Sequence, residues 1–173
     1  MNSRIGCFVA LLGLSFSSPA FAELWQWDDI LLDGSQENPP VATPGTGLAT
    51  AMLDTDTGIM SIEGTFSDLI GTTTLAHLHG IALPDQNAGV IFGLNIDVGV
   101  TSGSFSGTSG VLNQATMDGI IAGNSYINIH TSFRQGGEIR GQVTNGVQVP
   151  EPSSIALTLL ATGALLGYRW RRK

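Results

Sequence analysis

The chain has a single cysteine among its 173 residues, and this is Cys7, close to the N-terminus. The residues beyond it therefore supply no disulfide, no thiol nucleophile and no cysteine ligand for a metal. Cations are also scarce, because residues 23–148 contain thirteen Asp and Glu, two Arg and no Lys, a net charge of −11. Since phosphate contacts need cations, we expect no nucleic acid among the partners of this protein.

The common sequence motifs of catalysis are missing as well. The chain has no G-x-S-x-G nucleophile elbow, no H-E-x-x-H zinc helix, no phosphate-binding P-loop and no dinucleotide fingerprint. We therefore favour a protein with a binding or structural role over an enzyme.

The first 22 residues have the three parts of a secretory signal peptide. Arg4 supplies the positive charge, an apolar run covers residues 5–16, and Ala20-Phe21-Ala22 forms an A-x-A cleavage site. The apolar run is too short to span a membrane, which takes about 20 residues. We predict cleavage after Ala22 and export of the remaining chain.

The other end of the chain combines three features in order. The residues Val149, Pro150, Glu151 and Pro152 precede an uncharged run over residues 153–168, and four cations follow within residues 169–173. A basic cluster of this kind stays in the cytoplasm, so the run is expected to insert as a helix with the body of the protein on the far side.

Residues 149–173 together resemble a PEP-CTERM sorting signal. The resemblance implies recognition by an exosortase after passage through the export machinery, transient membrane insertion, and removal of the tail near Val149–Pro152. It also implies a place at the outer surface or outside the cell, often alongside exopolysaccharide, as in a biofilm or among other envelope components. A permanent single-pass anchor is the alternative.

Residues 23–148 form one predicted domain with the alternating pattern of short β-strands. We expect an all-β fold, a Greek-key-like antiparallel β-sandwich with one short helix at residues 114–122. Residues 54–58 are predicted to form a hairpin turn. The expected strands cover residues 25–32, 47–54, 58–66, 73–79, 90–96, 104–107, 125–131 and 138–144.

Four segments of this domain resemble a known family. They are Gly34-Ser35-Gln36-Glu37-Asn38-Pro39-Pro40-Val41, Ala76-His77-Leu78-His79-Gly80, residues 122–131 (AGNSYINIHT) and residues 137–142 (GEIRGQ). In this order they resemble a CHRD domain, over residues 24–144. The resemblance implies an extracellular β-rich domain and no known catalytic activity.

All three histidines of the chain lie in this domain. His77 and His79 are two residues apart, so a strand would place both on one face. In the predicted strand that carries His130, Ile127 and Ile129 share the opposite face. If these two strands are neighbours, three ring nitrogens converge on one point.

Imidazole suits copper and zinc, so the second hypothesis, beside a binding or structural role, is a metal-binding domain of the redox type that holds one copper or zinc ion on His77, His79 and His130. The alternative is that the histidines form hydrogen bonds across the sheet. The His-x-His pair is similar to the copper site of copper/zinc superoxide dismutases. Three histidines cannot supply a copper site and a zinc site together, so we do not expect a two-metal dismutase.

Two charged residues share one face of the predicted strand over residues 138–144. Glu138 and Arg140 are candidates to buttress His130 or to bind the carboxylate of a ligand, and the alternative is a cross-strand ion pair. Glu37, just before Pro39-Pro40, is either a ligand contact or part of an extended edge that blocks further strand pairing.

Overall fold

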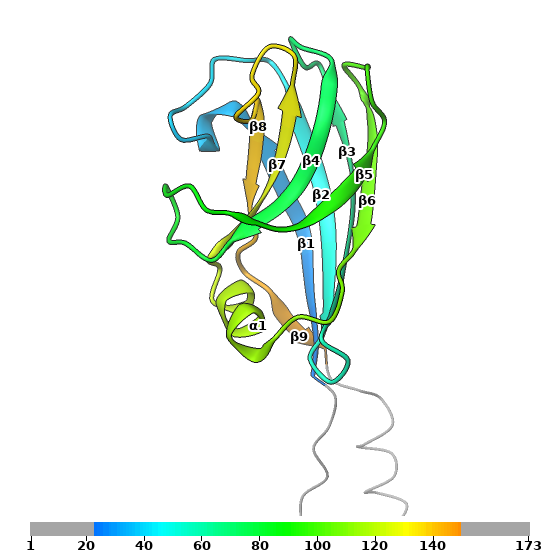
Figure 1. The fold of residues 1–173 in the computed structure, drawn as a ribbon, viewed down its shortest axis with the longest axis vertical. Helices are drawn as coiled ribbons and strands as arrows, with labels where there is room; N and C mark the ends of the chain where they lie inside the picture. Colours follow the sequence, from blue (N-terminus) through cyan, green and yellow to red (C-terminus); the bar gives the residue numbers. More distant parts are fainter. Residues whose placement is uncertain (1–22, 150–173) are drawn as a thin grey trace, which may run out of the picture.

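The computed structural model describes residues 23–149, and the alternating segments fold there as strands (Figure 1). All eight predicted strands and the predicted helix are confirmed, with bounds within two residues in most cases. The elements are β1 (Leu24–Asp33), the 3₁₀-helix η1 (Gly34–Gln36), β2 (Thr46–Asp54), β3 (Ile59–Ser67), β4 (Thr73–Gly80), β5 (Val90–Ile96), β6 (Gly103–Thr108), α1 (Gln114–Ile121), β7 (Ser125–Thr131), β8 (Ile139–Gln142) and β9 (Val147–Val149).

The strands form one antiparallel sheet that closes on itself, in the order β2-β3-β6-β5-β4-β7-β8-β1, with β1 also paired to β2. The prediction of a sandwich of two sheets is therefore wrong, although the all-β class and the Greek-key arrangement of β3-β6-β5-β4 are confirmed. The physical reason is the bend in β1. A register shift between Trp27 and Ile30, with Asp29 at φ 55°, turns this strand so that it reaches both β2 and β8.

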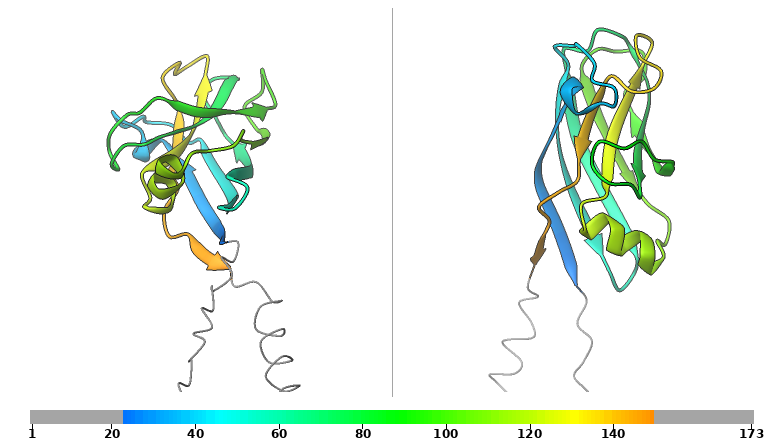
Figure 2. Two further views of the ribbon diagram at one scale, coloured as in Figure 1. Left: turned by 60° about the horizontal axis from the view of Figure 1, so that its bottom comes forward. Right: turned by 90° about the vertical axis from the view of Figure 1, so that its left-hand side faces the viewer.

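Closure is uneven around the barrel-like sheet. β1 meets β8 at the single pair Asp33↔Arg140, and β5 meets β6 at only two pairs, whereas β2 and β3 pair along nine residues. The two thin contacts separate β1, β2, β3 and β6 from β5, β4, β7 and β8, and this division explains why the sequence pattern resembles that of a sandwich. Figure 2 shows the sheet from two further directions.

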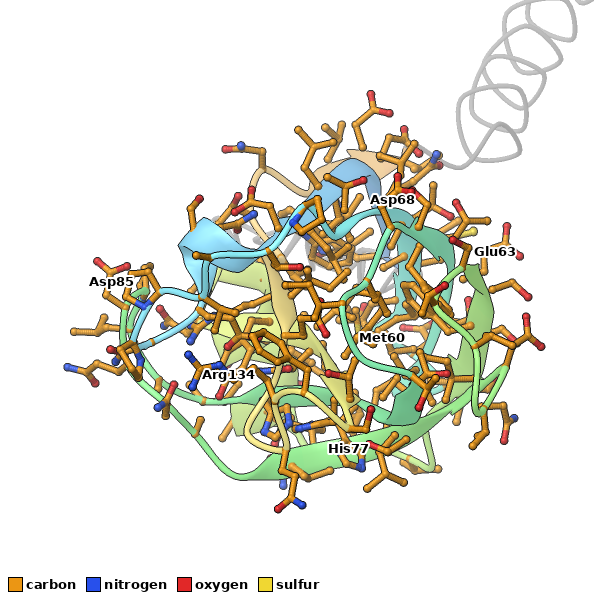
Figure 3. The ribbon with its side chains drawn as sticks, turned by 90° about the horizontal axis from the view of Figure 1, so that it is seen from above. Met60, Glu63, Asp68, His77, Asp85 and Arg134 are labelled. Atoms are coloured by element: carbon orange, nitrogen blue, oxygen red, sulfur yellow. The ribbon has the colours of Figure 1, made fainter. Side chains whose placement is uncertain are left out.

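The core lies inside this closed sheet. Alternate residues of every long strand point inwards, as Met60 does in Figure 3, whereas Glu63 of the same strand lies at the edge of the body. The helix α1 adds Met117 and Ile120 at one end. The largest apolar side chains that are almost completely buried are Trp27, Leu32, Leu53, Met60, Leu78, Ile120, Ile127, Ile129 and Ile139.

The turns and caps follow from local chemistry. Asp54 Oδ1 accepts hydrogen bonds from the backbone N–H groups of Asp56 and Thr57, which confirms the predicted turn between β2 and β3. Asn113 caps α1 by accepting from the N–H of Thr116, and Gly123 at φ 81° ends it.

The outer face of β7 is covered, so all seven of its residues are buried. Two loops at the left of Figure 1, residues 37–45 after η1 and residues 81–89 between β4 and β5, lie beside this part of the sheet. They are joined by hydrogen bonds from Asn38 Nδ2 to the carbonyl of Asp85 (2.5 Å) and from Asn87 Nδ2 to the carbonyl of Asn38 (2.8 Å). Polar side chains on this face are therefore enclosed.

The two ends of the described chain lie at the same end of the body (Figure 1), because the short strand β9 pairs with the start of β1 at Leu24↔Val149. The sequence pattern did not predict β9, which contains Val149, the first residue of the predicted sorting motif. The predicted signal peptide with its cleavage site after Ala22, and Pro150, Glu151, Pro152 and the C-terminal hydrophobic helix, lie outside the described residues. Within residues 23–149, no helix has the length and apolar character that crossing a membrane requires.

Candidate functional site: a three-histidine cluster

The pairing of β4 with β7 brings the three histidines together. These strands are antiparallel neighbours, with Leu75 opposite His130, His77 opposite Asn128 and His79 opposite Tyr126. Because side chains alternate along each strand, all three imidazoles lie on the outer face. The condition that the two strands be neighbours is thus fulfilled.

The ring nitrogens approach closely. His77 Nδ1 lies 3.0 Å from His130 Nε2, and one nitrogen from each of the three rings lies within 4.8 Å of the others. The ring centroids are 5.5 Å apart for His77 and His79, 4.9 Å for His77 and His130, and 5.8 Å for His79 and His130. Three potential ligand atoms therefore converge on one point.

Two of the three imidazole rings form hydrogen bonds with backbone carbonyls. Nδ1 of His79 lies 3.0 Å from the carbonyl of Ala88, and Nδ1 of His130 lies 2.9 Å from that of Gln135. A carbonyl only accepts, so each Nδ1 must carry the proton and each Nε2 is left with a lone pair. His79 Nε2 is buried and has no hydrogen-bond partner within residues 23–149.

The surroundings of His77 and His79 favour the neutral imidazole. Burial lowers the pKa of His77, and the neighbouring rings of His130 and His79 lower it further. Burial also lowers the pKa of His79, reinforced by His130 and the charge of Arg140 and opposed by the hydrogen bond to Ala88. Neutral imidazole is the form that binds a metal ion.

On one side the cluster borders β5. Gly93 lies opposite His77 in the sheet, and an added Cβ there would meet only His77, at 3.8 Å. His77 is half-buried, whereas His130 is 9% exposed. Gly93 itself therefore places no side chain against His77.

Glu138 lies on the same outer face of the sheet as the histidines, but its carboxylate binds other groups. Its carboxylate is completely buried and accepts hydrogen bonds from the hydroxyls of Thr43 and Thr131, at 2.6 Å each, and from the backbone N–H groups of Ile70 (2.6 Å) and Gly71 (3.1 Å). Burial alone would raise the pKa of Glu138, but these four bonds hold it below its usual range. Both oxygens are therefore used to tie the β3–β4 connection to the sheet.

Arg140 lies closer to the cluster, at the end of a stack of side chains. Its guanidinium is 3.4 Å from the centre of the Tyr126 ring, and that ring lies parallel to His79, with centroids 5.1 Å apart and planes at 5°. Arg140 is only 1% exposed and donates to the carbonyl of Gln86 at 3.2 Å. The sequence pattern did not predict a role for Tyr126, because tyrosine is a common residue in strands.

Glu37 is enclosed beside the cluster. It is 7% exposed, its Oε2 accepts from Asn128 Nδ2 at 3.3 Å, and its Oε1 and Asn128 Oδ1 have no partner within the described residues. Burial raises the pKa of Glu37 to about 7, against the opposing effects of Arg140 and Asn128. Residues 37–45 form no strand, so the extended edge is not found, and the loop turns the Glu37 carboxyl inwards beside Asn128.

Comparison with protein families identifies the domain. The CHRD domain model matches residues 29–143, more than half of the chain. The chain belongs to the CHRD family. The model of the PEP-CTERM protein-sorting motif matches residues 148–173, so the chain carries this motif at its C-terminus. No curated protein and no solved structure matches it.

The two matches show in which kind of protein and in which domain the histidine cluster lies. The sorting motif implies processing by exosortase and a secreted protein associated with the cell envelope. The CHRD match covers all three histidines as well as Glu37, Tyr126 and Arg140. The cluster thus belongs to the CHRD domain of an exported protein.

Proposed function

We propose that this CHRD protein is a binding module of the cell envelope that holds one copper or zinc ion on His77, His79 and His130. The observation that carries the proposal is how the ring nitrogens are occupied. His79 and His130 each bind a backbone carbonyl through Nδ1, His130 Nε2 faces His77, and His79 Nε2 is buried without a partner among the described residues. Histidines that bind metals usually have such an outer partner, which fixes the tautomer of the ring.

The spacing of the nitrogens is compatible with coordination. Zinc–imidazole bonds are about 2.0–2.1 Å long, so two ligands of a tetrahedral ion are roughly 3.3 Å apart. The pair formed by His77 and His130 is close to this spacing at 3.0 Å, and the third nitrogen lies within 4.8 Å. Small side-chain rotations would bring all three into reach.

The donor set favours copper or zinc among the biological metals. Three imidazoles suit these ions, and the domain has no cysteine. With three protein ligands, a fourth coordination position is left for water or another small ligand, and Gly93 leaves room for it beside His77.

The role we propose is binding rather than catalysis. The sorting motif would deliver the domain to the outer surface or the surrounding matrix, where exopolysaccharide and other envelope components are its neighbours. A bound ion there serves either to store the metal or to fasten β4 to β7.

The proposal is tested on the full chain, produced with its export signals and purified from the envelope without chelator. Metal content and calorimetric titration with copper and zinc are compared for the wild type and for His77→Gln, His79→Gln and His130→Gln. We expect one ion per chain for the wild type and a loss of at least a hundredfold in affinity for each variant.

Leu75→Gln is the matched control, because Leu75 lies on the same face of β4 and is 55% exposed. It should bind as the wild type does. Binding that is unchanged in the three histidine variants would falsify the metal site.

A further inference from the structure

The loop between β4 and β5, residues 81–89, crosses the outer face of the sheet next to the histidines, and we refer to it as the strap. It is closed at its base by the hydrogen bond from Gly80 N–H to the carbonyl of Gly89 (3.1 Å), and Ala82 N–H donates to the carbonyl of Asn124 (3.0 Å). Asp85 marks its outer edge at the left of Figure 3. The strap is therefore anchored on the end of β4 and on the residue that precedes β7.

One residue of the strap, Ala88, is held through both its backbone N–H and its backbone carbonyl. The N–H of Ala88 donates to the hydroxyl of Tyr126 at 3.0 Å, and the carbonyl of Ala88 accepts from His79 Nδ1 at 3.0 Å. The Tyr126 ring also stacks on the ring of His79. Tyr126 thus contacts His79 directly, through the stack, and indirectly, through Ala88.

Arg140 holds the other side of this arrangement. Its guanidinium lies over the free face of Tyr126 and donates to the carbonyl of Gln86 and to Asn87 Oδ1 (3.4 Å), both in the strap. A buried cation is costly unless well compensated, and within residues 23–149 no carboxylate lies in ion-pair contact with this one. Its compensation comes from the tyrosine ring, the strap and Gln142, whose Oε1 accepts from Arg140 Nη2 at 3.0 Å.

We infer that Tyr126 and Arg140 are positioning residues that hold the carbonyl of Ala88 on Nδ1 of His79, so that Nε2 of this ring is the nitrogen presented to the cluster. The role of this arrangement rests on the proposed metal site, but the arrangement itself can be measured without metal. A neutral histidine without such a partner exchanges its proton between the two nitrogens. If Ala88 were released, the His79 ring would therefore no longer be held in one tautomer and one orientation.

The decisive variant is Tyr126→Phe, which keeps the ring and removes only the hydroxyl. Its control is Ser109→Ala, because Ser109 Oγ accepts from the backbone N–H of Met60 at 2.9 Å at a buried position of another part of the sheet. Both variants remove a hydroxyl that accepts a backbone hydrogen bond, and only one of them touches the strap. Asn87→Ala is a second strap variant, at an exposed position, and it removes the contact with Arg140 and the hydrogen bond to the carbonyl of Asn38.

Two measurements are made on the full chain. The first is the side-chain ¹⁵N spectrum of the metal-free protein, in which His79 should have its proton on Nδ1 in the wild type and in Ser109→Ala, and a mixture of both tautomers in Tyr126→Phe. The second is zinc affinity by competition titration. Changes of outer partners cost about 10–100-fold in metal affinity, so we expect about a tenfold loss for Tyr126→Phe and a smaller one for Asn87→Ala.

The outcomes separate this inference from the metal proposal. If Tyr126→Phe and Asn87→Ala leave His79 in a single tautomer, the inference is overturned, whatever the metal titration gives. If Ser109→Ala lowers zinc affinity as much as Tyr126→Phe does, the effect is one of general stability and the inference also fails. If the histidine variants show that no metal binds, the tautomer spectra still decide whether the strap positions His79.

Discussion

His77 Nδ1 lies 3.0 Å from His130 Nε2, and the second nitrogen of His130 is already occupied by the carbonyl of Gln135. Because His130 must donate to that carbonyl, its Nε2 accepts, and the proton between the two rings belongs to His77. In the absence of metal, His77 is therefore the donor in this pair.

This relationship predicts a tautomer switch on metal binding. A metal ion that binds both facing nitrogens displaces the shared proton, so His77 must carry its proton on Nε2 instead of Nδ1. Side-chain ¹⁵N spectra with and without zinc should show this change for His77 and no change for His79 or His130. A His77 signal that stays the same after saturation with zinc would show that this ring is not a ligand through Nδ1.

A second prediction concerns Glu138, whose two oxygens each accept two hydrogen bonds. In Glu138→Gln one oxygen becomes an NH₂ group, which faces a backbone N–H and cannot accept from it. Hydrogen bonds to a charged group contribute about 1.5–3 kcal/mol each, so we expect a loss of about 2–3 kcal/mol in the free energy of unfolding. Urea denaturation measures it, and Glu63→Gln, at an exposed position, is the control.

Because the pKa of Glu138 is lowered in the folded protein, the loss of unfolding free energy in Glu138→Gln depends on pH. Its pKa is lowered in the folded protein from the ordinary 4.5. The stabilisation by the carboxylate is therefore complete above pH 4.5 and is lost as the pH falls through the lower folded value. The stability difference between wild type and Glu138→Gln should shrink below pH 4.5, and a difference that stays constant down to pH 2 contradicts this assignment.

The sequence predicted the strands and the shared face of the histidines because both depend on local alternation. The bounds of β5 and β7 agree with the prediction, and His77 and His130 could be assigned to the outer face from Leu78 and Ile129. Closure of the sheet could not be predicted in this way. It depends on a bulge around Asp29 and on the pairing of β1 with both β2 and β8, which leave no periodic signal.

The enclosure of the site was also beyond the sequence pattern. Asn38 and Asp85, which join the two covering loops, are 47 residues apart, and neither residue type is unusual in a loop. Alternation alone predicts that Tyr126 and Asn128 are half-exposed strand residues, whereas the loops bury both. The surroundings of a polar residue thus depend on which loop lies over it, and this is decided by long-range contacts.

The buried carboxyl of Glu37 leads to a prediction of the opposite sign from that for Glu138. Its pKa is raised from 4.5 to about 7, so the folded state binds more protons than the unfolded state between these values. Its contribution to stability therefore decreases as the pH rises from 4.5 to 7. Glu37→Gln removes this dependence and offers a donor to Asn128 Oδ1, so at pH 8 the variant should be more stable by on the order of 1–2 kcal/mol.

Thermal or urea unfolding at pH 4 and pH 8 checks this expectation. At pH 4 the carboxyl is protonated in both states, and the variant and the wild type should differ little. A Glu37→Gln protein that is less stable than the wild type at pH 8 would show that the ionised carboxylate is needed in the folded domain.

The last prediction uses the pair of glycines that precedes Glu138. Gly137 has φ 130°, and an added Cβ would collide with the amide of Asn128 and with Glu37 Oε1, whereas a Cβ on Gly136 would meet nothing within 4 Å. Gly137→Ala therefore combines backbone strain with the displacement of two buried polar groups, and we expect a loss of about 2–4 kcal/mol in the free energy of unfolding. Gly136→Ala should be almost neutral.

Since Asn128 lies opposite both His77 and Arg140 in the sheet, Gly137→Ala should also weaken zinc binding in the fraction that stays folded. Equal stability of the two alanine variants in urea denaturation would mean that the chain relaxes around residue 137, and that the enclosure of Glu37 and Asn128 is looser than this structure describes.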